Sequence, residues 1–578
     1  MRKSVLVLIA TLVTLTLSVR AQAQSCANGS DDTISQHGVT LTLDQSYTCG
    51  RFANGDYWVV PQSAGGTVTI ASMTPAFNGT ENGWEVNPDS TSDQGFDSRA
   101  HNFDAGRVPA LPYVAGADQA IVKAVSVDVN DVDCRPCLDT AIVVTVLDEA
   151  PPGDGATIFR PPYFGPAKPL YDTSALRVEA LPSLAPTADT PSLDGLATRY
   201  ERVQLDHQGN WIGRAIHPVQ NMPDYGASIG HDSGNAALRL MLDDSVDDKL
   251  PALINFVQFG IDLHHMLLGG LEWSANGGHH NGRKLALVFA AELLDDQAMR
   301  DAIAAAPYNT FGEDGSLSLG AEAQIPLWGQ PCGEQSYWTN QTDQSGNRAC
   351  IDPYGTIDGG QMPADSYQFC CNSGMWKGTS LALLLMPSLR CLWDYELFVE
   401  YVDRWIERGA HTQPDPCAPS DGDHNNYGVT FGPDGNGGCI EDTDSTCTAA
   451  ELADGASEPC IGRWPGKHGA GQDDGYYTSA FAAAMWTEYR STVPDGPPDC
   501  GNGTGGAGGA GGAGGGATGG AGGSSTGGSG GTSATAPTED DGGCGCRIVG
   551  APNPAVPWTI TLLALLGLAA GGRRRRSR

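Results

Sequence analysis

The chain has 578 residues, and its 67 acidic residues outnumber its 33 Lys and Arg residues, which gives a net charge of −34. A surface this negative repels nucleic acid and anionic lipid surfaces, so both are excluded as partners. Sixteen cysteines are typical of an exported protein with disulfides rather than of a cytosolic one.

The first residues have the features of a secretory signal peptide. Positions 2 and 3 are basic, residues 5–17 are apolar apart from threonines, and residues 21–23 supply the small side chains that a signal peptidase needs. The apolar run is too short for a transmembrane helix. We therefore expect residues 1–23 to be removed from an exported protein.

Residues 26–150 are predicted to form a β-rich domain. Runs rich in β-branched residues alternate with turn-forming pairs such as Asn54-Gly55. This spacing favours a β-sandwich-like domain. The predicted strands are 39–43, 57–60, 67–72, 120–129 and 140–147.

A proline-rich segment, residues 151–232, is predicted to be an extended connector, and residues 233–500 a mainly helical domain. In the latter, apolar residues recur at the i, i+3, i+4, i+7 spacing of a helix face. Asp394 is a candidate N-cap for the fourth helix. Residues 411–465, rich in Gly, Asp and Cys, are predicted to be a disulfide-containing insertion. The predicted helices cover 250–261, 285–293, 375–385, 397–405 and 481–489.

Residues 501–543 consist largely of Gly, Ala, Ser and Thr, and this composition predicts a disordered linker. A tail follows at 544–578, in which Cys544-Gly545-Cys546-Arg547 precedes an apolar helix at 556–570 and an arginine cluster. This order resembles the MYXO-CTERM sorting signal. The alternative is an ordinary C-terminal membrane anchor.

The resemblance implies that a sorting protease of the envelope removes the apolar helix, and that Cys544 or Cys546 carries the anchor at the cell surface. Processing at both ends removes nine Lys and Arg residues and no acid, leaving 24 against 67 acidic residues, a net charge near −43. Such a chain can recruit divalent cations. Residues 421–425 begin like a Ca²⁺ loop, with further acidic residues at 441–444, so Ca²⁺ is a possible cofactor.

The densest polar cluster, residues 273–284, lies in a loop between two apolar helices. It contains Asn276, His279 and Arg283, and the start of the next helix adds partial positive charge. A carboxylate or sulfate is therefore the expected ligand. The alternative is a helix connection whose polar residues are merely solvated.

Two further clusters hold residues suited to proton transfer. The first contains His217, Asn221 and Tyr225, since His and Tyr are common bases next to a sugar carboxylate and Asn can neutralise it. The second contains His468, Asp474 and Tyr477, where Asp474 either pairs with His468 or caps the last helix. In both clusters a purely structural role is the alternative.

Two cysteines in the β-rich domain, Cys134 and Cys137, have thiol-redox spacing, but no helix follows them, so a structural disulfide is favoured. Other candidates that would close short loops are Cys26–Cys49, Cys332–Cys350 and Cys447–Cys460. The chain contains no Gly-x-Ser-x-Gly elbow, His-Glu-x-x-His helix or P-loop.

An exported β-rich domain beside a helical domain with His, Asn, Arg and Tyr loops resembles bacterial polysaccharide lyases of the heparinase and alginate-lyase type, which are built on an α/α toroid. Here the β-rich domain precedes the helices instead of following them. The resemblance implies a cell-surface enzyme whose partner is an extracellular polysaccharide. The alternative is a non-enzymatic adhesion or matrix-binding protein.

The chemistry of a lyase suggests a role for each candidate residue. Asn276, His279 and Arg283 would hold the uronate carboxylate. Tyr225 or His217 would take the C5 proton, and Tyr477 or His468 would protonate the leaving oxygen. In a hydrolase, Asp262 or Glu272 would act with Asp474 across the scissile bond.

Overall fold

The computed structural model describes a sheet domain followed by a helical region, so the chain is of mixed α+β class. The predicted signal peptide, linker and sorting tail lie outside the described residues. Within the described part of the chain, no helix has the length and apolar composition needed to cross a membrane. The described residues are 29–91, 93–129, 134–209, 211–319, 326–328, 368–408, 426–428, 436, 463–465 and 478–500.

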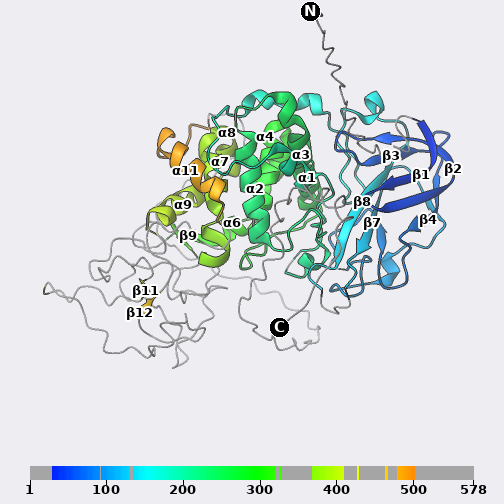
Figure 1. Cartoon of the computed structure of the whole chain (residues 1–578), viewed down its shortest axis with the longest axis horizontal. Helices are drawn as coiled ribbons and strands as arrows, with labels where there is room; N and C mark the ends of the chain where they lie inside the picture. Colours follow the sequence, from blue (N-terminus) through cyan, green and yellow to red (C-terminus); the bar gives the residue numbers. More distant parts are fainter. Residues whose placement is uncertain are drawn as a thin grey trace, which may run out of the picture. The chain divides into compact units, whose positions relative to one another are not determined.

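The sheet domain is one curled sheet of eight strands in the order β5-β7-β8-β3-β2-β4-β6, with β1 paired to β2 (Figure 1). All its pairs are antiparallel except that between β3 and β8. A single curled sheet thus replaces the expected sandwich. The strands are β1 (Gly29–Gln36), β2 (Val39–Arg51), β3 (Tyr57–Val60), β4 (Val68–Thr74), β5 (Trp84–Val86), β6 (Tyr113–Ala115), β7 (Gln119–Ser126) and β8 (Leu138–Val146).

Strands β7 and β8 are buried on both faces. Side chains alternate along a strand, and here Ile121 and Ile142 enter the core of the sheet domain, while Val122 and Val143 enter the core of the helical region. Near-continuous apolar runs are typical of strands covered on both sides. Strands β7 and β8 therefore contribute to both cores and join the sheet domain to the helices.

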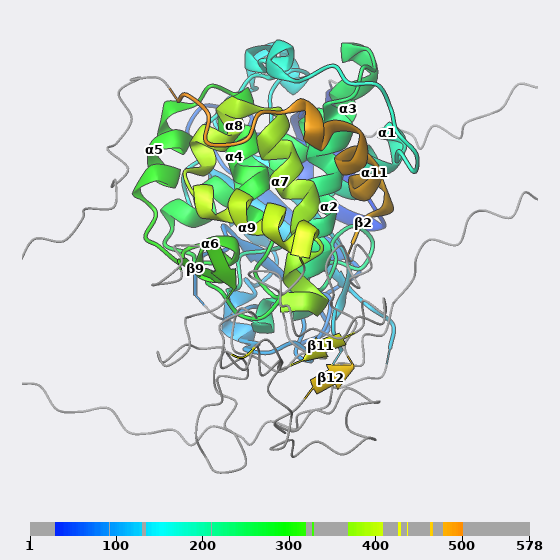
Figure 2. The same ribbon diagram turned by 90° about the vertical axis from the view of Figure 1, so that its left-hand side faces the viewer.

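The helical region is built around long apolar helices, and Figure 2 shows α7 between α2, α9 and α11. Helices α3 and α4 pack so closely that a Cβ atom at Gly260 would lie only 2.4 Å from the carbonyl oxygen of Ala286. The glycine makes this close contact possible. The helices are α1 (Leu193–Tyr200), α2 (Gly226–Leu240), α3 (Val246–Leu268), α4 (Arg283–Leu293), α5 (Gln297–Ala305), α6 (Gly312–Gly315), α7 (Trp376–Leu385), α8 (Pro387–Trp393), α9 (Glu396–Arg408) and α11 (Ala480–Tyr489).

The helix ends include one correction. Asp394 adopts a left-handed conformation with φ 48° and ends α8, so it is not the N-cap of the helix that follows. Helix α11 is capped by Ser479, whose side chain accepts a hydrogen bond from the amide of Ala482, so the capping role considered for Asp474 is filled by another residue. A disulfide between Cys391 and Cys500 ties the segment after α11 to α8.

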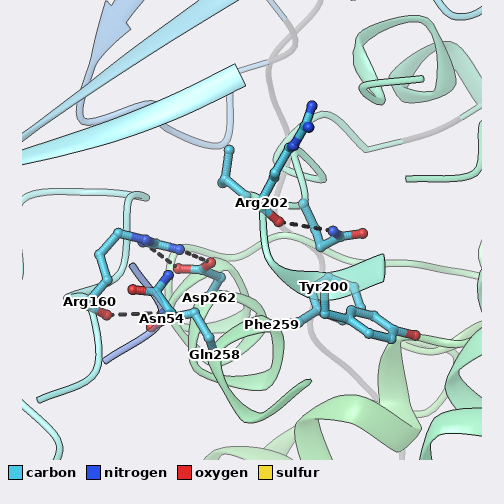
Figure 3. Close-up of a pocket in the computed structure, with 9 residues that line it drawn as sticks. Asn54, Arg160, Tyr200, Arg202, Gln258, Phe259 and Asp262 are labelled. Atoms are coloured by element: carbon cyan, nitrogen blue, oxygen red, sulfur yellow. Dashed lines mark hydrogen bonds and ion pairs between the residues drawn. The ribbon is translucent and has the colours of Figure 1, made fainter. Parts of the chain in front are cut away.

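A buried ion-pair cluster joins the sheet domain to the helices. Arg160, which is fully buried, donates from Nε to Asp56 at 2.7 Å. Its Nη1 and Nη2 donate to Asp262 of α3 at 3.1 and 2.5 Å, as Figure 3 shows. Its carbonyl oxygen accepts a hydrogen bond from Gln258 at 3.0 Å. Because both carboxylates are nearly inaccessible to solvent, each depends on Arg160 for its counter-charge.

Replacing Arg160 tests this dependence. Arg160→Leu leaves two carboxylates buried without a counter-charge, and we expect it to lower the free energy of unfolding by about 3–5 kcal/mol. Denaturant unfolding of the purified protein measures the loss. The control is Arg177→Leu, because Arg177 is 40% exposed in its pair with Asp295 and should cost at most about 1 kcal/mol. Equal losses in the two variants would contradict the interpretation.

Candidate functional site

A small polar pocket opens where the predicted connector meets the loop before α4, and its volume is about 10 Å³. This is room for about one water molecule, so a sugar would have to bind at the mouth of the pocket rather than inside it. Every lining residue comes from residues 206–224 or 279–283. They are Asp206, Gln208, Trp211, Gly213, Arg214, His217, Asp224, His279, His280 and Arg283.

Tight packing of glycines positions the loop before α4. A Cβ at Gly226, the first residue of α2, would lie 2.0 Å from the carbonyl oxygen of His279. Gly282 has φ 91°, and a Cβ there would lie 2.4 Å from the backbone nitrogen of Gly230. Close backbone approach therefore holds His279 against the start of α2. The loop is largely buried, which overturns the alternative of a merely solvated connection.

The positive charges of this loop are neutralised by the protein's own carboxylates. Glu313 accepts a hydrogen bond from the amide of Gly282 at 2.6 Å, so it occupies the start of α4 where a ligand carboxylate was expected. Burial raises the pKa of Glu313 to about 7. Lys284 donates to Asp314 at 2.6 and 2.8 Å.

Arg283 is likewise committed to the fold. Its Nε and Nη2 donate to Asp206 at 2.7 and 2.8 Å, and its Nη1 donates to the carbonyl oxygens of His279 and Asn281. Burial alone would raise the pKa of Asp206, but Arg283 and His217 hold it well below its usual range. Arg283 therefore orients the loop and is not the free carboxylate ligand that we expected.

His217 also has a structural partner at each ring nitrogen. Its Nε2 lies 3.3 Å from Asp206 Oδ1, and its Nδ1 lies 2.7 Å from the carbonyl oxygen of Pro223. Both ring nitrogens therefore already have acceptors of the protein as partners, and the proton abstraction expected of His217 stays a prediction.

Tyr225 and His279 pack against each other beside the pocket. Their rings meet edge to face, with centroids 4.8 Å apart, and the amide of Gly278 donates to the Tyr225 hydroxyl oxygen at 3.1 Å. The ring nitrogens of His279 make no hydrogen bond with the described residues. Burial, reinforced by nearby cations of which Arg214 is the foremost, lowers the pKa of His279 to about 3. The imidazole is therefore neutral near pH 7, but its surroundings disfavour a proton on it. A bound carboxylate would have to raise its pKa before it could act as an effective base.

Arg214 is a functional candidate that the sequence analysis missed. Its guanidinium lies 5.3 Å from the centre of the Tyr225 ring and pairs with Asp224. Its Nε is buried without a hydrogen-bond partner among the described residues. Arg214 thus has one unpaired donor, at an atom closed to solvent, whereas every guanidinium nitrogen of Arg283 has a partner. No motif marks it, since only the fold brings residue 214 next to residues 225 and 279.

The remaining predicted residues divide into two groups. Asn221 is fully buried, and its amide donates to the carbonyl oxygens of Arg202 and Val203, so it supports the chain and is not a substrate ligand. Asn276 belongs to the same loop as His279 but does not line the pocket. Several predicted residues lie outside the described residues: His468, Asp474, Tyr477, Cys544, Cys546 and the Ca²⁺ candidates at 421–425 and 441–444.

The carboxylates considered for a hydrolase are not placed for that role. Asp262 is held in the buried cluster with Arg160. Glu272 is exposed and does not line the pocket. In the pocket, Asp206 and Asp224 are each paired with an arginine.

Among the described residues, one group has the spacing of metal ligands: Asp97 with Cys134 and Cys137. The two sulfurs are bonded to each other, which confirms the predicted disulfide. Sulfurs in a disulfide are not thiolate ligands. This group therefore does not hold a metal in the oxidised protein.

Comparison with known proteins leaves the site to be interpreted from its own geometry. No protein-family model, no curated protein and no solved structure matches the chain.

The protonation state of His279 is the first testable property of the site. We expect its ring to be neutral at pH 5.5, because burial and nearby cations lower its pKa to about 3. NMR of protein labelled at histidine measures this, with the signal assigned by its loss in His279→Gln. A titration midpoint near 6.5 would contradict the assignment.

The same shift has a consequence for stability. In the unfolded chain His279 binds a proton near pH 6.5, while in the folded protein it does not do so until about pH 3. Acidification through this window therefore favours unfolding. His279→Gln should lose less stability than the wild type between pH 7 and pH 5, and equal losses would speak against the lowered pKa.

Proposed function

We propose that the protein is a lyase that cleaves an acidic extracellular polysaccharide by β-elimination. The observation that carries the proposal is the placement of a neutral His279 and the Arg214 guanidinium in the lining of one pocket, with the Tyr225 phenol packed against both. An adhesion protein needs no such convergence of a base, a weak acid and a cation. We further propose that it acts at the cell surface, held by its processed C-terminus.

In the proposed reaction, Arg214 binds the carboxylate of a uronate residue. Neutralising this carboxylate makes the C5 hydrogen more acidic, and His279 accepts that proton. The electron pair forms a C4–C5 double bond as the C4–oxygen bond breaks, and Tyr225 protonates the departing oxygen. No water is consumed, and one product ends in an unsaturated sugar.

The ion pairs of the pocket favour elimination over hydrolysis. A glycosidase requires two carboxylates on opposite sides of the bond, one acting as an acid and the other as a base or nucleophile. Asp206 is committed to Arg283, and Asp224 to Arg214. An elimination requires a neutral base and a cation, which His279 and Arg214 supply.

For the helical region we propose part of an α/α toroid. The close packing of α3 on α4 and of α2 on α7 supports this arrangement, because toroids are built from helix pairs. The pocket then lies at the end of the helices where α2 and α4 begin, since Tyr225 precedes α2 and His279 lies in the loop before α4.

The proposal predicts which substrates are cleaved. Purified protein incubated with uronate-containing polysaccharides should release products that absorb in the ultraviolet, in proportion to the new reducing ends. Neutral polysaccharides should not be cleaved. New reducing ends without ultraviolet absorbance would indicate a hydrolase, and binding of every polymer without cleavage would indicate an adhesin.

Substitutions at the pocket test the assigned roles on the polymer that is cleaved. Tyr225→Phe and His279→Gln should each lower kcat by about 10²–10⁴-fold. Arg214→Ala should lower kcat/KM by about 10²–10³-fold. The matched controls are Tyr308→Phe, at an exposed tyrosine, and His231→Gln, at a histidine outside the pocket. Pocket variants as active as these controls would contradict the assignment.

A further inference from the structure

Arg135 lies in a small loop of the sheet domain that is closed by a covalent bond. The disulfide between Cys134 and Cys137 closes this loop, with the two Cα atoms 4.9 Å apart. Both cysteines are buried, whereas Arg135 is exposed. The Asp97 carboxylate lies within 4.8 Å of the sulfurs and disfavours thiolate formation. The disulfide therefore serves to fix the loop rather than to exchange electrons.

The guanidinium of Arg135 packs against a wall of the pocket. Its central carbon lies 4.9 Å from the centre of the Trp211 ring, and Trp211 is one of the pocket-lining residues. The ring of His101 meets Trp211 edge-on at 4.9 Å. An arginine stacked by its face keeps the hydrogen-bond donors of its edge available. Of the described acidic residues, none forms an ion pair with Arg135.

Backbone hydrogen bonds fix the position of this loop relative to the pocket. The amide of Cys137 donates to the carbonyl oxygen of Ala215 at 2.7 Å, directly beside Arg214. The amide of Val219, four residues after Ala215, donates to the carbonyl oxygen of Leu138, the residue after Cys137, at 2.9 Å. These hydrogen bonds fix the position of the loop that carries Arg135 relative to the segment that carries Arg214. Both arginines lie close enough to His279 to lower its pKa.

We propose that Arg135 is a second anion-binding residue, which contacts the carboxylate or sulfate of the sugar next to the one held by Arg214. This inference rests on the proposed function. It names the substrate class as a polymer with anionic groups on adjacent sugars. The chain carries a net charge of −34, so its long-range field repels such a polymer. A pair of local cations supplies the attraction that overcomes this repulsion.

The test compares Arg135→Gln with Arg177→Gln, a control at an exposed arginine away from the pocket. The probes are polygalacturonate, with a carboxylate on every sugar, dextran sulfate, and neutral dextran. Calorimetry with the purified full-length protein gives Kd at several salt concentrations. Steady-state kinetics give KM and kcat on any probe that is cleaved.

We expect Arg135→Gln to raise Kd, and KM where cleavage occurs, by about fivefold to tenfold for a charged probe. It should also weaken the salt dependence of binding and change KM more than kcat. The charged probe with the larger loss identifies the preferred anion. Neutral dextran should show no difference between the variants.

Two outcomes separate this inference from the proposed function. If a charged probe is bound but not cleaved, and Arg135→Gln weakens that binding, the lyase proposal fails while the second anion site stands. If polygalacturonate is cleaved and Arg135→Gln matches Arg177→Gln in Kd, KM and salt dependence, the second anion site is overturned while the lyase proposal stands.

Discussion

The candidate site depends on one buried carboxylate, Asp206. It binds Arg283 through two hydrogen bonds and lies 3.3 Å from His217, so it connects the segment after α1, the segment before α2 and the first turn of α4. A buried carboxylate is stable only with such partners. Without Asp206, two cationic or polar side chains would lie in the pocket wall without a counter-charge, and the loop that carries His279 would lose its anchor.

This internal pairing decides which residues are left for a ligand. Glu313, Asp314 and Asp206 satisfy the charges that the sequence places at the start of α4. Two other arginines have fewer partners among the described residues: Arg214, which lines the pocket and has an unpaired Nε, and Arg135, which packs on Trp211. The basic loop of residues 273–284 is therefore a scaffold, and the neighbouring segment supplies the recognition. His279 is the one residue of this loop to which we assign a role in the proposed reaction.

The parts of the fold with strong periodicity could be predicted from the sequence. All five expected strands and all five expected helices are present. Each is marked in the sequence by an apolar run or by apolar residues at regular spacing. Strands β5 and β6, with three residues each, are too short to show a period. The sandwich was wrong because a strand pattern reports which faces are buried, not whether one sheet curls or two sheets stack.

The site was predictable only in part, for a physical reason. His279 stood out because Gly-Gly-His-His is unusual in a plain connection between helices, and Tyr225 because it shares a loop with His217. Asp206 carries no signal among 67 acidic residues. The ion pair that commits Arg283 to the fold forms between segments far apart in the chain. The sequence therefore does not show that Arg214, rather than Arg283, is the candidate ligand.

The central claim is cleavage by elimination, and the fate of solvent oxygen tests it most directly. A charged polysaccharide that the protein degrades should be cleaved in water enriched in ¹⁸O, and the products weighed by mass spectrometry. Elimination predicts that the two products of each cleavage together weigh one water molecule less than the two products of hydrolysis would. It also predicts that bond cleavage incorporates no ¹⁸O. Products that carry one ¹⁸O from each cleaved bond would contradict the account, because they require water as the nucleophile.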